Sequence, residues 1–394
     1  MSIDKFLICN HVLFNCQLSI VNYPLTLKFS QIIGQDGTKT LLSSMMESER
    51  IPHAQLFLGA KGSGGLALAM AFAQLVLCDN PKDGEACGRC VSCIKTRKMI
   101  HPDVHYSYPT VGSKIVATNF LKEWRSAVEE NPYMSLNQWL QKIGADNKQG
   151  NINKDECLAI VKKLSLKTFE GKYKILIMWL PEFLGKEGNR LLKLIEEPPE
   201  NTLFILVAEN QELILNTILS RCQIVKINPL QDEEVAQGLV ERMKLSEDEA
   251  MKIARLANGN FNEAMSLVDN TENDNAKLFL EWFRACYKGN GKELVTLTEQ
   301  LAKLGRENQK YFLTYSLHFL RELMVLRVTG NSDNVRLQPT EKQTAINMSK
   351  VIGFEKVEKI SDLFNDAVFH VERNANPKIL FLDTSIKLHK VLRR

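Results

Sequence analysis

A glycine-rich segment, Gly59-Ala60-Lys61-Gly62-Ser63-Gly64-Gly65-Leu66, directly follows an apolar run and opens a helical pattern. This is the setting of a phosphate-binding loop, G-x-x-x-x-G-K-[ST], whose glycines let backbone N–H groups surround a phosphate at a helix N-terminus. Gly65 stands where that pattern has its lysine, and Leu66 where it has the hydroxyl that binds Mg²⁺. The lost lysine contact is worth on the order of 1.5–3 kcal/mol. The sequence therefore predicts a degenerate nucleotide site built on Gly59, Gly62, Gly64 and Gly65, with an ordinary glycine-rich turn as the alternative.

A second part of nucleotide chemistry is missing after the apolar run 174–180. A nucleotide hydrolase ends this strand in Asp-Glu, which holds Mg²⁺ and orients the attacking water. The residues here are Met178-Trp179-Leu180-Pro181-Glu182, so no aspartate is present and the glutamate comes several residues late. Two independent losses of metal-handling groups argue against ATP hydrolysis by this chain.

Four of the nine cysteines lie close together, with the spacing Cys78-x8-Cys87-x2-Cys90-x2-Cys93. Thiolates at x2 spacing can converge on one tetrahedral ion, and four sulfurs close a structural Zn²⁺ site. The alternatives are four buried free thiols or an iron–sulfur cluster. His101 is too far along the chain to be an expected ligand. The other cysteines are scattered and odd in number, which favours a reduced, cytoplasmic protein over a disulfide framework.

One arginine, in Ser220-Arg221-Cys222, lies at the end of the helical pattern 212–221 and before the apolar run 222–227. Judged locally, Arg221 is a solvated charge that suits the negative end of a helix dipole.

Apolar runs must position these residues. Runs typical of strands alternate with amphipathic segments such as 66–77 and 188–197, which predicts a parallel α/β sheet. Pro198-Pro199 should end the second of these helices, because proline lacks the backbone donor. The runs expected to form strands are 54–60, 103–109, 174–180, 202–208 and 222–227.

The rest of the chain reads as helical. Residues 116–155 look like a helical, polar surface insertion into the α/β part, and 230–270 like a small helical unit. A polar linker is expected at 269–275 and helices from 276 to 394. The chain of 394 residues has a net charge of +4, which does not by itself indicate nucleic acid. No apolar run is long enough for a membrane span, and residues 1–28 look like an extension without the features of a signal peptide.

Together these residues resemble the AAA+ clamp-loader family over about residues 29–268. The strings that carry the resemblance are FSQIIGQ (29–35), IPHAQLFLG (51–59), the four-cysteine module, NRLLKLIEEPPENTLFILVAE (189–209), ILSRC (218–222) and ANGNFNEA (257–264). The resemblance implies a RecA-like α/β domain (29–228) with a zinc module (78–93) and the helical insertion (about 116–155). A helical lid (229–273) and an all-helical collar domain for oligomerisation (274–394) would follow.

The chain departs from the family's ATPase subunits at the phosphate loop, at Asp-Glu, where Met178 or Trp179 stands in the aspartate position, and at the lid. The lid motif G-x-x-R of those subunits reads Gly259-Asn260-Phe261-Asn262 here. The remaining Arg221 makes the pattern similar to the delta-prime class of bacterial DNA polymerase III subunits. These subunits do not hydrolyse ATP but offer an arginine finger to a neighbour.

The resemblance implies gamma/tau-like ATPase subunits and a delta-like subunit as partners. The sliding clamp and primed DNA would be reached through the assembled complex, in the cytoplasm. Two other functions stay open at this point. The chain could be an active ATPase subunit of the same loader, or a zinc-dependent nucleic-acid-binding module around the basic stretch 89–98.

Overall fold

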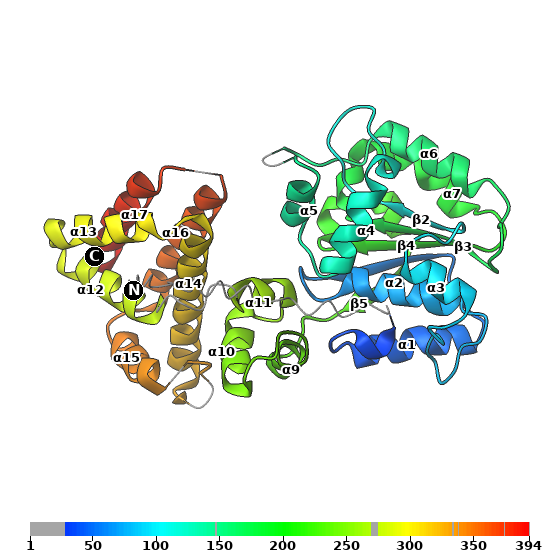
Figure 1. Ribbon diagram of the computed structural model, residues 1–394. Coiled ribbons are helices and arrows are strands. Elements are labelled where there is room, and N and C mark those ends of the chain that lie inside the picture. Colours follow the sequence, from blue (N-terminus) through cyan, green and yellow to red (C-terminus); the bar gives the residue numbers. More distant parts are fainter. Residues whose placement is uncertain are drawn as a thin grey trace, which may run out of the picture.

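The computed structural model describes residues 28–145, 148–268, 275–332, 335–337, 339–373 and 375–393. Its centre is one parallel sheet of five strands in the order β2-β3-β4-β1-β5 (Figure 1). Each strand lies within one of the predicted runs. The strands are β1 (Ala54–Gly59), β2 (Val104–Ser107), β3 (Lys174–Trp179), β4 (Thr202–Ala208) and β5 (Gln223–Ile227).

Both faces of the sheet are covered, which explains why β3 and β4 are apolar at every position. Successive side chains of a strand point to opposite faces. Ile175, Ile177 and Trp179 therefore belong to one core, while Leu176 and Met178 belong to another. The first core includes helices α1 (Asp36–Glu47) and α2 (Gly65–Val76), and the second includes α6 (Lys154–Leu164), the 3₁₀ segment η3 (Pro181–Leu191), α7 (Leu192–Glu196) and α8 (Asn216–Leu219).

The helix expected over 188–197 is divided between η3 and α7. The chain is 3₁₀-helical up to Leu191, with a break at Gly185, and becomes α-helical only from Leu192. The helix ends at Glu196, immediately before Glu197 and the two prolines, as predicted.

The insertion forms η2 (Ala117–Phe120), α4 (Leu121–Glu130) and α5 (Leu136–Lys142). The expectation that it lies on the surface is wrong, because Trp124 and Trp139 are both fully buried. The ring of Trp124 stacks on Tyr108 at 4.1 Å and meets Trp139 edge-on at 5.3 Å. The insertion thus adds its own aromatic core beside the end of β2.

The remaining helices form two groups. Helices α9 (Asp232–Met243), α10 (Glu247–Ala257) and α11 (Phe261–Val268) lie beside the sheet domain (Figure 1). A separate core joins α12 (Asn275–Lys288), α13 (Gly291–Lys303), α14 (Arg306–Thr329), α15 (Pro339–Ser349), α16 (Phe354–Glu372) and α17 (Pro377–Arg393). The ion pairs Glu263–Lys310 (3.7 Å) and Asp232–Arg336 (3.4 Å) connect the two groups.

The domain boundaries inferred from the sequence stay predictions. Residues 1–27 of the expected extension and most of the linker at 269–275 lie outside the described residues. Within the part of the chain that the structure describes, none of the helices combines the length and apolar composition that a membrane span requires.

Candidate functional site

The glycine-rich loop lies where the parallel strands end. Gly59 is the last residue of β1, and α2 begins at Gly65. Gly62 (φ +69°) and Gly64 (φ +94°) take left-handed backbone conformations that glycine adopts without strain. Trp179 from the end of β3 and Ala208 from the end of β4 line the same pocket. The structure thus brings the predicted residues of the degenerate nucleotide site together at the carboxyl edge of the sheet.

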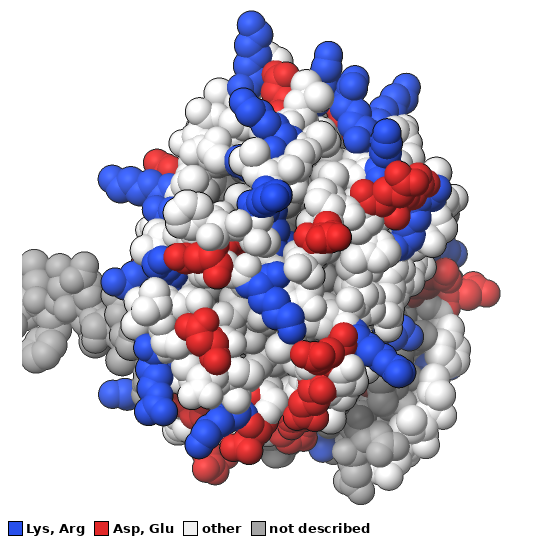
Figure 2. All heavy atoms as spheres, turned by 90° about the vertical axis from the view of Figure 1, so that its right-hand side faces the viewer, with Lys and Arg blue, Asp and Glu red and all other residues white. Residues whose placement is uncertain are grey.

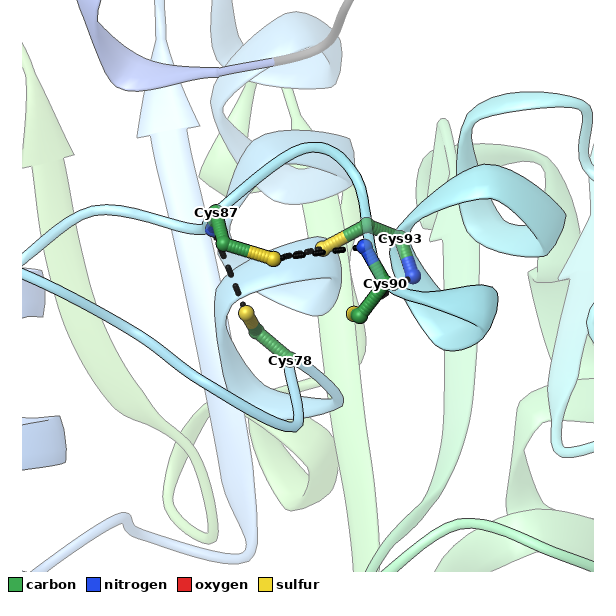
Figure 3. A group of neighbouring side chains, drawn as sticks. All are labelled: Cys78, Cys87, Cys90 and Cys93. Carbon is green, nitrogen blue, oxygen red and sulfur yellow. Dashed lines mark hydrogen bonds between the residues drawn. The ribbon is translucent and has the colours of Figure 1, made fainter.

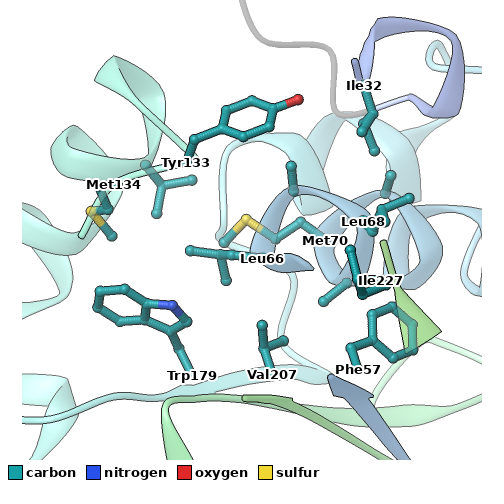
Figure 4. Packing of buried hydrophobic residues seen from close by; sticks show 14 of the residues in the cluster. Ile32, Phe57, Leu66, Leu68, Met70, Tyr133, Met134, Trp179, Val207 and Ile227 are labelled. Carbon is teal, nitrogen blue, oxygen red and sulfur yellow. The ribbon is translucent and has the colours of Figure 1, made fainter. Parts of the chain in front are cut away.

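This pocket is filled by the chain's own side chains. Leu66 lies among Tyr133, Met134 and Trp179 (Figure 4), and all four are at most 6% exposed. The free volume that remains is about 30 Å³, enough for about two water molecules and far too little for a nucleotide. Trp179, and not Met178, is the residue that faces the loop, because Met178 packs on the other side of the sheet.

The three-helix group closes over the loop. The backbone N–H of Phe261 donates to the carbonyl of Gly62 at 3.1 Å. A Cβ on Gly62 would lie 1.8 Å from Asn260 Oδ1, so only glycine fits there. Asn262 occupies the position at which the resembling ATPase subunits have an arginine. Its Oδ1 accepts a hydrogen bond from Asn131 of the insertion at 2.6 Å.

Tyr133 connects the loop, the insertion and the lid. Its hydroxyl accepts a hydrogen bond from the backbone N–H of Ile33 at 3.1 Å, and its ring meets Phe261 at 5.1 Å. The guanidinium of Arg242 lies over both rings, 5.4 Å from that of Tyr133 and 5.3 Å from that of Phe261. The insertion therefore supplies contacts between the glycine-rich loop and the helices α9 to α11, a role that sequence reasoning missed.

Two carboxyl groups lie at the same edge, the late glutamate Glu182 noted in the sequence and Glu209, which the sequence did not single out. Glu182 Oε1 accepts hydrogen bonds from the backbone N–H groups of Glu209 (2.6 Å) and Asn210 (2.8 Å). Burial raises the pKa of Glu182. Burial also raises the pKa of Glu209, to about 7, although Lys61 opposes the shift. The backbone engages only Oε1 of Glu182, while its buried Oε2 has no hydrogen-bond partner among the described residues.

The four clustered cysteines converge as predicted. Their sulfurs point toward one another (Figure 3) and all lie within 4.8 Å, with Cys87 and Cys93 3.9 Å apart. Four sulfurs at about 2.3 Å from a tetrahedral zinc would be about 3.8 Å apart, so the group fits this ion. Cys78 follows the end of α2, and Cys90 caps α3 (Val91–Arg97). His101 is buried elsewhere and accepts a hydrogen bond from the backbone of Asp103 at 3.2 Å.

The surroundings of the cluster favour a bound cation. The sulfurs of Cys78, Cys87 and Cys90 each accept a backbone N–H bond, at 3.2 to 3.3 Å, from the next cysteine of the cluster. Backbone hydrogen bonding, first from Arg89, lowers the pKa of the Cys87 thiol to about 6. Burial raises the pKa of Cys93 and of Cys78. Without a metal, Cys78 and Cys93 therefore stay protonated, and a divalent ion bound here would displace those protons.

Arg221 lies at the opposite, amino edge of the sheet. It precedes β5, in which Ile227 pairs with Gly59 of the phosphate loop and Gln223 with Gln55. The strand from Gln223 to Ile227 alone spans about 13 Å, and Arg221 lies in the turn before it. The Arg221 side chain is 33% exposed, and it forms an ion pair with Glu196. Arg221 therefore cannot serve the pocket of its own chain.

The comparison with known families decides the identity. A family model described as "DNA polymerase III, delta subunit" matches residues 34–231, half of the chain. The chain belongs to this family. The resemblance drawn from the residues is thereby confirmed, as is the expected fold of a parallel sheet with a helical C-terminal region.

Curated relatives agree with this family. DNA polymerase III subunit delta' of Bacillus subtilis (strain 168) is 26% identical over 308 residues, which are 77% of this chain and 81% of the relative. Subunit tau of the same organism is 22% identical over 92% of this chain, which spans 61% of tau. Subunit delta' of Escherichia coli (strain K12) is 24% identical over 57% of each chain. A solved structure of a gamma subunit-related protein from Thermotoga maritima covers 90% of this chain and 100% of its own, with 14% identity and a TM-score of 0.36.

Proposed function

We propose that this chain is a non-hydrolysing subunit of the clamp loader of bacterial DNA polymerase III, and that Arg221 completes the ATP site of a neighbouring ATPase subunit. One observation carries the proposal. The predicted nucleotide pocket of the chain is filled by its own side chains, whereas the Arg221 side chain, 33% exposed, lies before β5 at the other edge of the sheet. A guanidinium keeps its charge and offers a planar fork of donors, which suits the spread negative charge of phosphoryl transfer.

The amino edge is suited to a protein neighbour. Leu166 and Phe169, which precede β3 at this edge, are 65% and 81% exposed. Figure 2 views the molecule from the side on which α3 and α7 lie in Figure 1, and there basic and acidic side chains are interspersed. A nucleic-acid surface would favour one continuous basic field. This mixture supports a subunit interface over the alternative of a zinc-dependent nucleic-acid-binding module.

The partners in this proposal are gamma/tau-like ATPase subunits and a delta-like subunit. The relatives carry such names. The sliding clamp and primed DNA would be contacted through the assembled complex, which works in the cytoplasm. The helical lid (229–273) would follow the α/β domain, the collar domain (274–394) would join the subunits, and ATP would be hydrolysed only by the partners. We also propose that Cys78, Cys87, Cys90 and Cys93 hold one structural Zn²⁺, because they form a closed set of four sulfurs.

Reconstitution of the loader tests the proposal. Complexes containing the wild-type chain, Arg221→Ala or Arg221→Lys would be assembled with the ATPase and delta-like subunits. ATP hydrolysis stimulated by clamp and DNA, and clamp loading, would then be measured. We expect intact assembly, with both activities reduced by Arg221→Ala and poorly restored by lysine, which lacks the planar fork. If Arg221→Ala assembles and loads clamps at the wild-type rate, Arg221 is only a surface charge and the mechanism in trans is wrong.

A further inference from the structure

The guanidinium of Arg221 is folded back onto its own chain. Its Nε donates to Glu196 Oε1 at 2.5 Å, and its Nη2 forms an ion pair with the same oxygen. Its Nη1 donates to the carbonyl of Thr217 at 2.7 Å and to the hydroxyl of Ser220 at 3.2 Å. A guanidinium has N–H donors on all three nitrogens, and each nitrogen has a partner here. A finger that reaches a phosphate must give up some of these bonds.

Glu196 is held in place by the local sequence. It is the last residue of α7, which ends beside α8, and Arg221 lies in the turn that follows α8. Ile195 anchors helix α7, because its side chain is buried in the core. Glu196 itself remains 43% exposed, and Arg221 33% exposed. The pair is thus well placed but accessible to a neighbouring subunit.

We propose that Glu196 is a positioning residue that acts as a latch on Arg221. In the free chain it holds the guanidinium against α8. In the complex the γ-phosphate of a neighbour's nucleotide displaces it. Phosphate oxygens form stronger, bidentate bonds with arginine, whereas an exposed ion pair contributes little, so the exchange is easy. The proposal rests on the function of Arg221 in trans proposed above, and it adds a group that restrains hydrolysis before the neighbour's site is fully formed.

Glu196→Gln tests the latch, because it removes the charge and keeps the shape. Loaders would be assembled with the wild-type chain, Glu196→Gln, Arg221→Ala and the double variant. We expect Glu196→Gln to raise the Arg221-dependent part of ATP hydrolysis, measured without clamp and DNA, by about 1.4- to 5-fold, the range for an exposed ion pair. The double variant should hydrolyse ATP like Arg221→Ala. Glu197→Gln is the matched control, since it removes the same charge from the next, exposed residue and should leave the rate unchanged.

Ionic strength gives a readout that a merely structural role would not change. Salt screens an exposed ion pair, so the ratio of the Glu196→Gln rate to the wild-type rate should fall toward one as salt increases. Melting temperatures of the free variants would check that they are folded.

The outcomes separate the two proposals. If Arg221→Ala hydrolyses ATP at the wild-type rate, both the finger and the latch are wrong. A second outcome is that Arg221→Ala lowers the rate of ATP hydrolysis while Glu196→Gln gives a rate equal to or below that of the wild type. In that case the latch role of Glu196 is wrong and the proposed role of Arg221 stands. Glu196→Gln could also raise the rate of ATP hydrolysis in the Arg221→Ala background. This would overturn the latch, because the effect would then not depend on Arg221.

Discussion

The two edges of the sheet differ in how deeply their predicted site residues are buried. At the carboxyl edge, Leu66, Tyr133 and Trp179 fill the pocket beside the glycine-rich loop and are buried as core. At the amino edge, the Arg221 side chain is 33% exposed and forms hydrogen bonds with Glu196 and Thr217. The side chains at the carboxyl edge should therefore contribute to stability as core residues do. A residue that acts on another subunit's ligand must instead stay accessible and adds little to stability.

The largest expected effect concerns the zinc proposed at the cysteine cluster. Cys78 follows α2, which starts at the phosphate loop and runs back across the sheet. Cys93→Ser should abolish stoichiometric zinc and remove the amide protection of about residues 78–98, because metal binding there provides folding free energy, about 10–16 kcal/mol for structural zinc in peptides. The carboxyl edge should keep its protection. Metal analysis measures the zinc content and hydrogen exchange the amide protection, with Cys222→Ser as the control variant. If protein purified without chelator holds no zinc, the metal assignment is wrong.

The next effect compares the edges directly. Trp179→Ala should lower the free energy of unfolding by about 3–5 kcal/mol, because it opens a cavity in a filled pocket. Arg221→Ala should lower it by less than about 1 kcal/mol, since an exposed ion pair contributes little. Urea unfolding of the two variants gives both values. Equal losses of unfolding free energy in the two variants would contradict the view that only the carboxyl edge is packed as core.

A smaller effect depends on pH. Burial raises the pKa of Glu209 from about 4.5 to about 7. Between these values the folded protein keeps a proton that the unfolded chain releases, so the free energy of unfolding should fall as pH rises from about 4.5 to 7. The fall is up to about 3 kcal/mol. Glu209→Gln should reduce this slope, although Glu182 contributes in the same direction.

Unfolding measured at pH 5 and pH 8 tests the sign. The exposed Glu212 provides the control variant Glu212→Gln, which should keep the wild-type slope. If Glu209→Gln and wild type lose the same stability between the two pH values, the carboxyl edge does not hold a neutral Glu209.

The smallest expected effect is that restoring the phosphate-loop residues gives no nucleotide activity. Gly65→Lys combined with Leu66→Thr restores the phosphate-loop pattern but should produce neither ATP binding nor hydrolysis. Trp179, Tyr133 and Met134 still fill the pocket, and a Cβ at residue 65 would lie 3.2 Å from Val207 Cγ1. Calorimetry with ATP and Mg²⁺ and an ATPase assay measure this. Metal-dependent turnover by the unmodified chain would contradict the account of a lost pocket.

Much of the fold could be predicted because its signals are local. The strands are short apolar runs between turn residues, and the prolines after Glu197 end a helix by their own chemistry. The cysteines converge because two-residue spacing places thiols on one turn, at the start of α3. The predicted metal ligands and the phosphate-loop glycines needed no knowledge of distant contacts.

The missed features depend on contacts between distant segments. Tyr133 reaches the loop and lid from an insertion whose polar composition suggested the surface. Two tryptophans of the insertion, Trp124 in α4 and Trp139 in α5, are buried and could have indicated that it packs into the core. The sequence could not choose between Met178 and Trp179, because neighbouring residues of a strand face opposite sides and only the packed sheet shows which side holds the loop. Glu196 and Arg221 are 25 residues apart and meet only through the packing of α7 and α8.

Single-turnover hydrolysis in the assembled loader tests the central claim most directly. Complexes with the wild-type chain and with Arg221→Ala would be filled with radiolabelled ATP and triggered with clamp and DNA. An arginine finger is worth about 10³–10⁵ in rate at its own site. We therefore predict that Arg221→Ala removes the fast phase of one bound nucleotide and leaves the others unchanged, with no nucleotide bound to this chain itself. Equal fast amplitudes in the two complexes, or nucleotide bound in the pocket beside Trp179, would contradict the account.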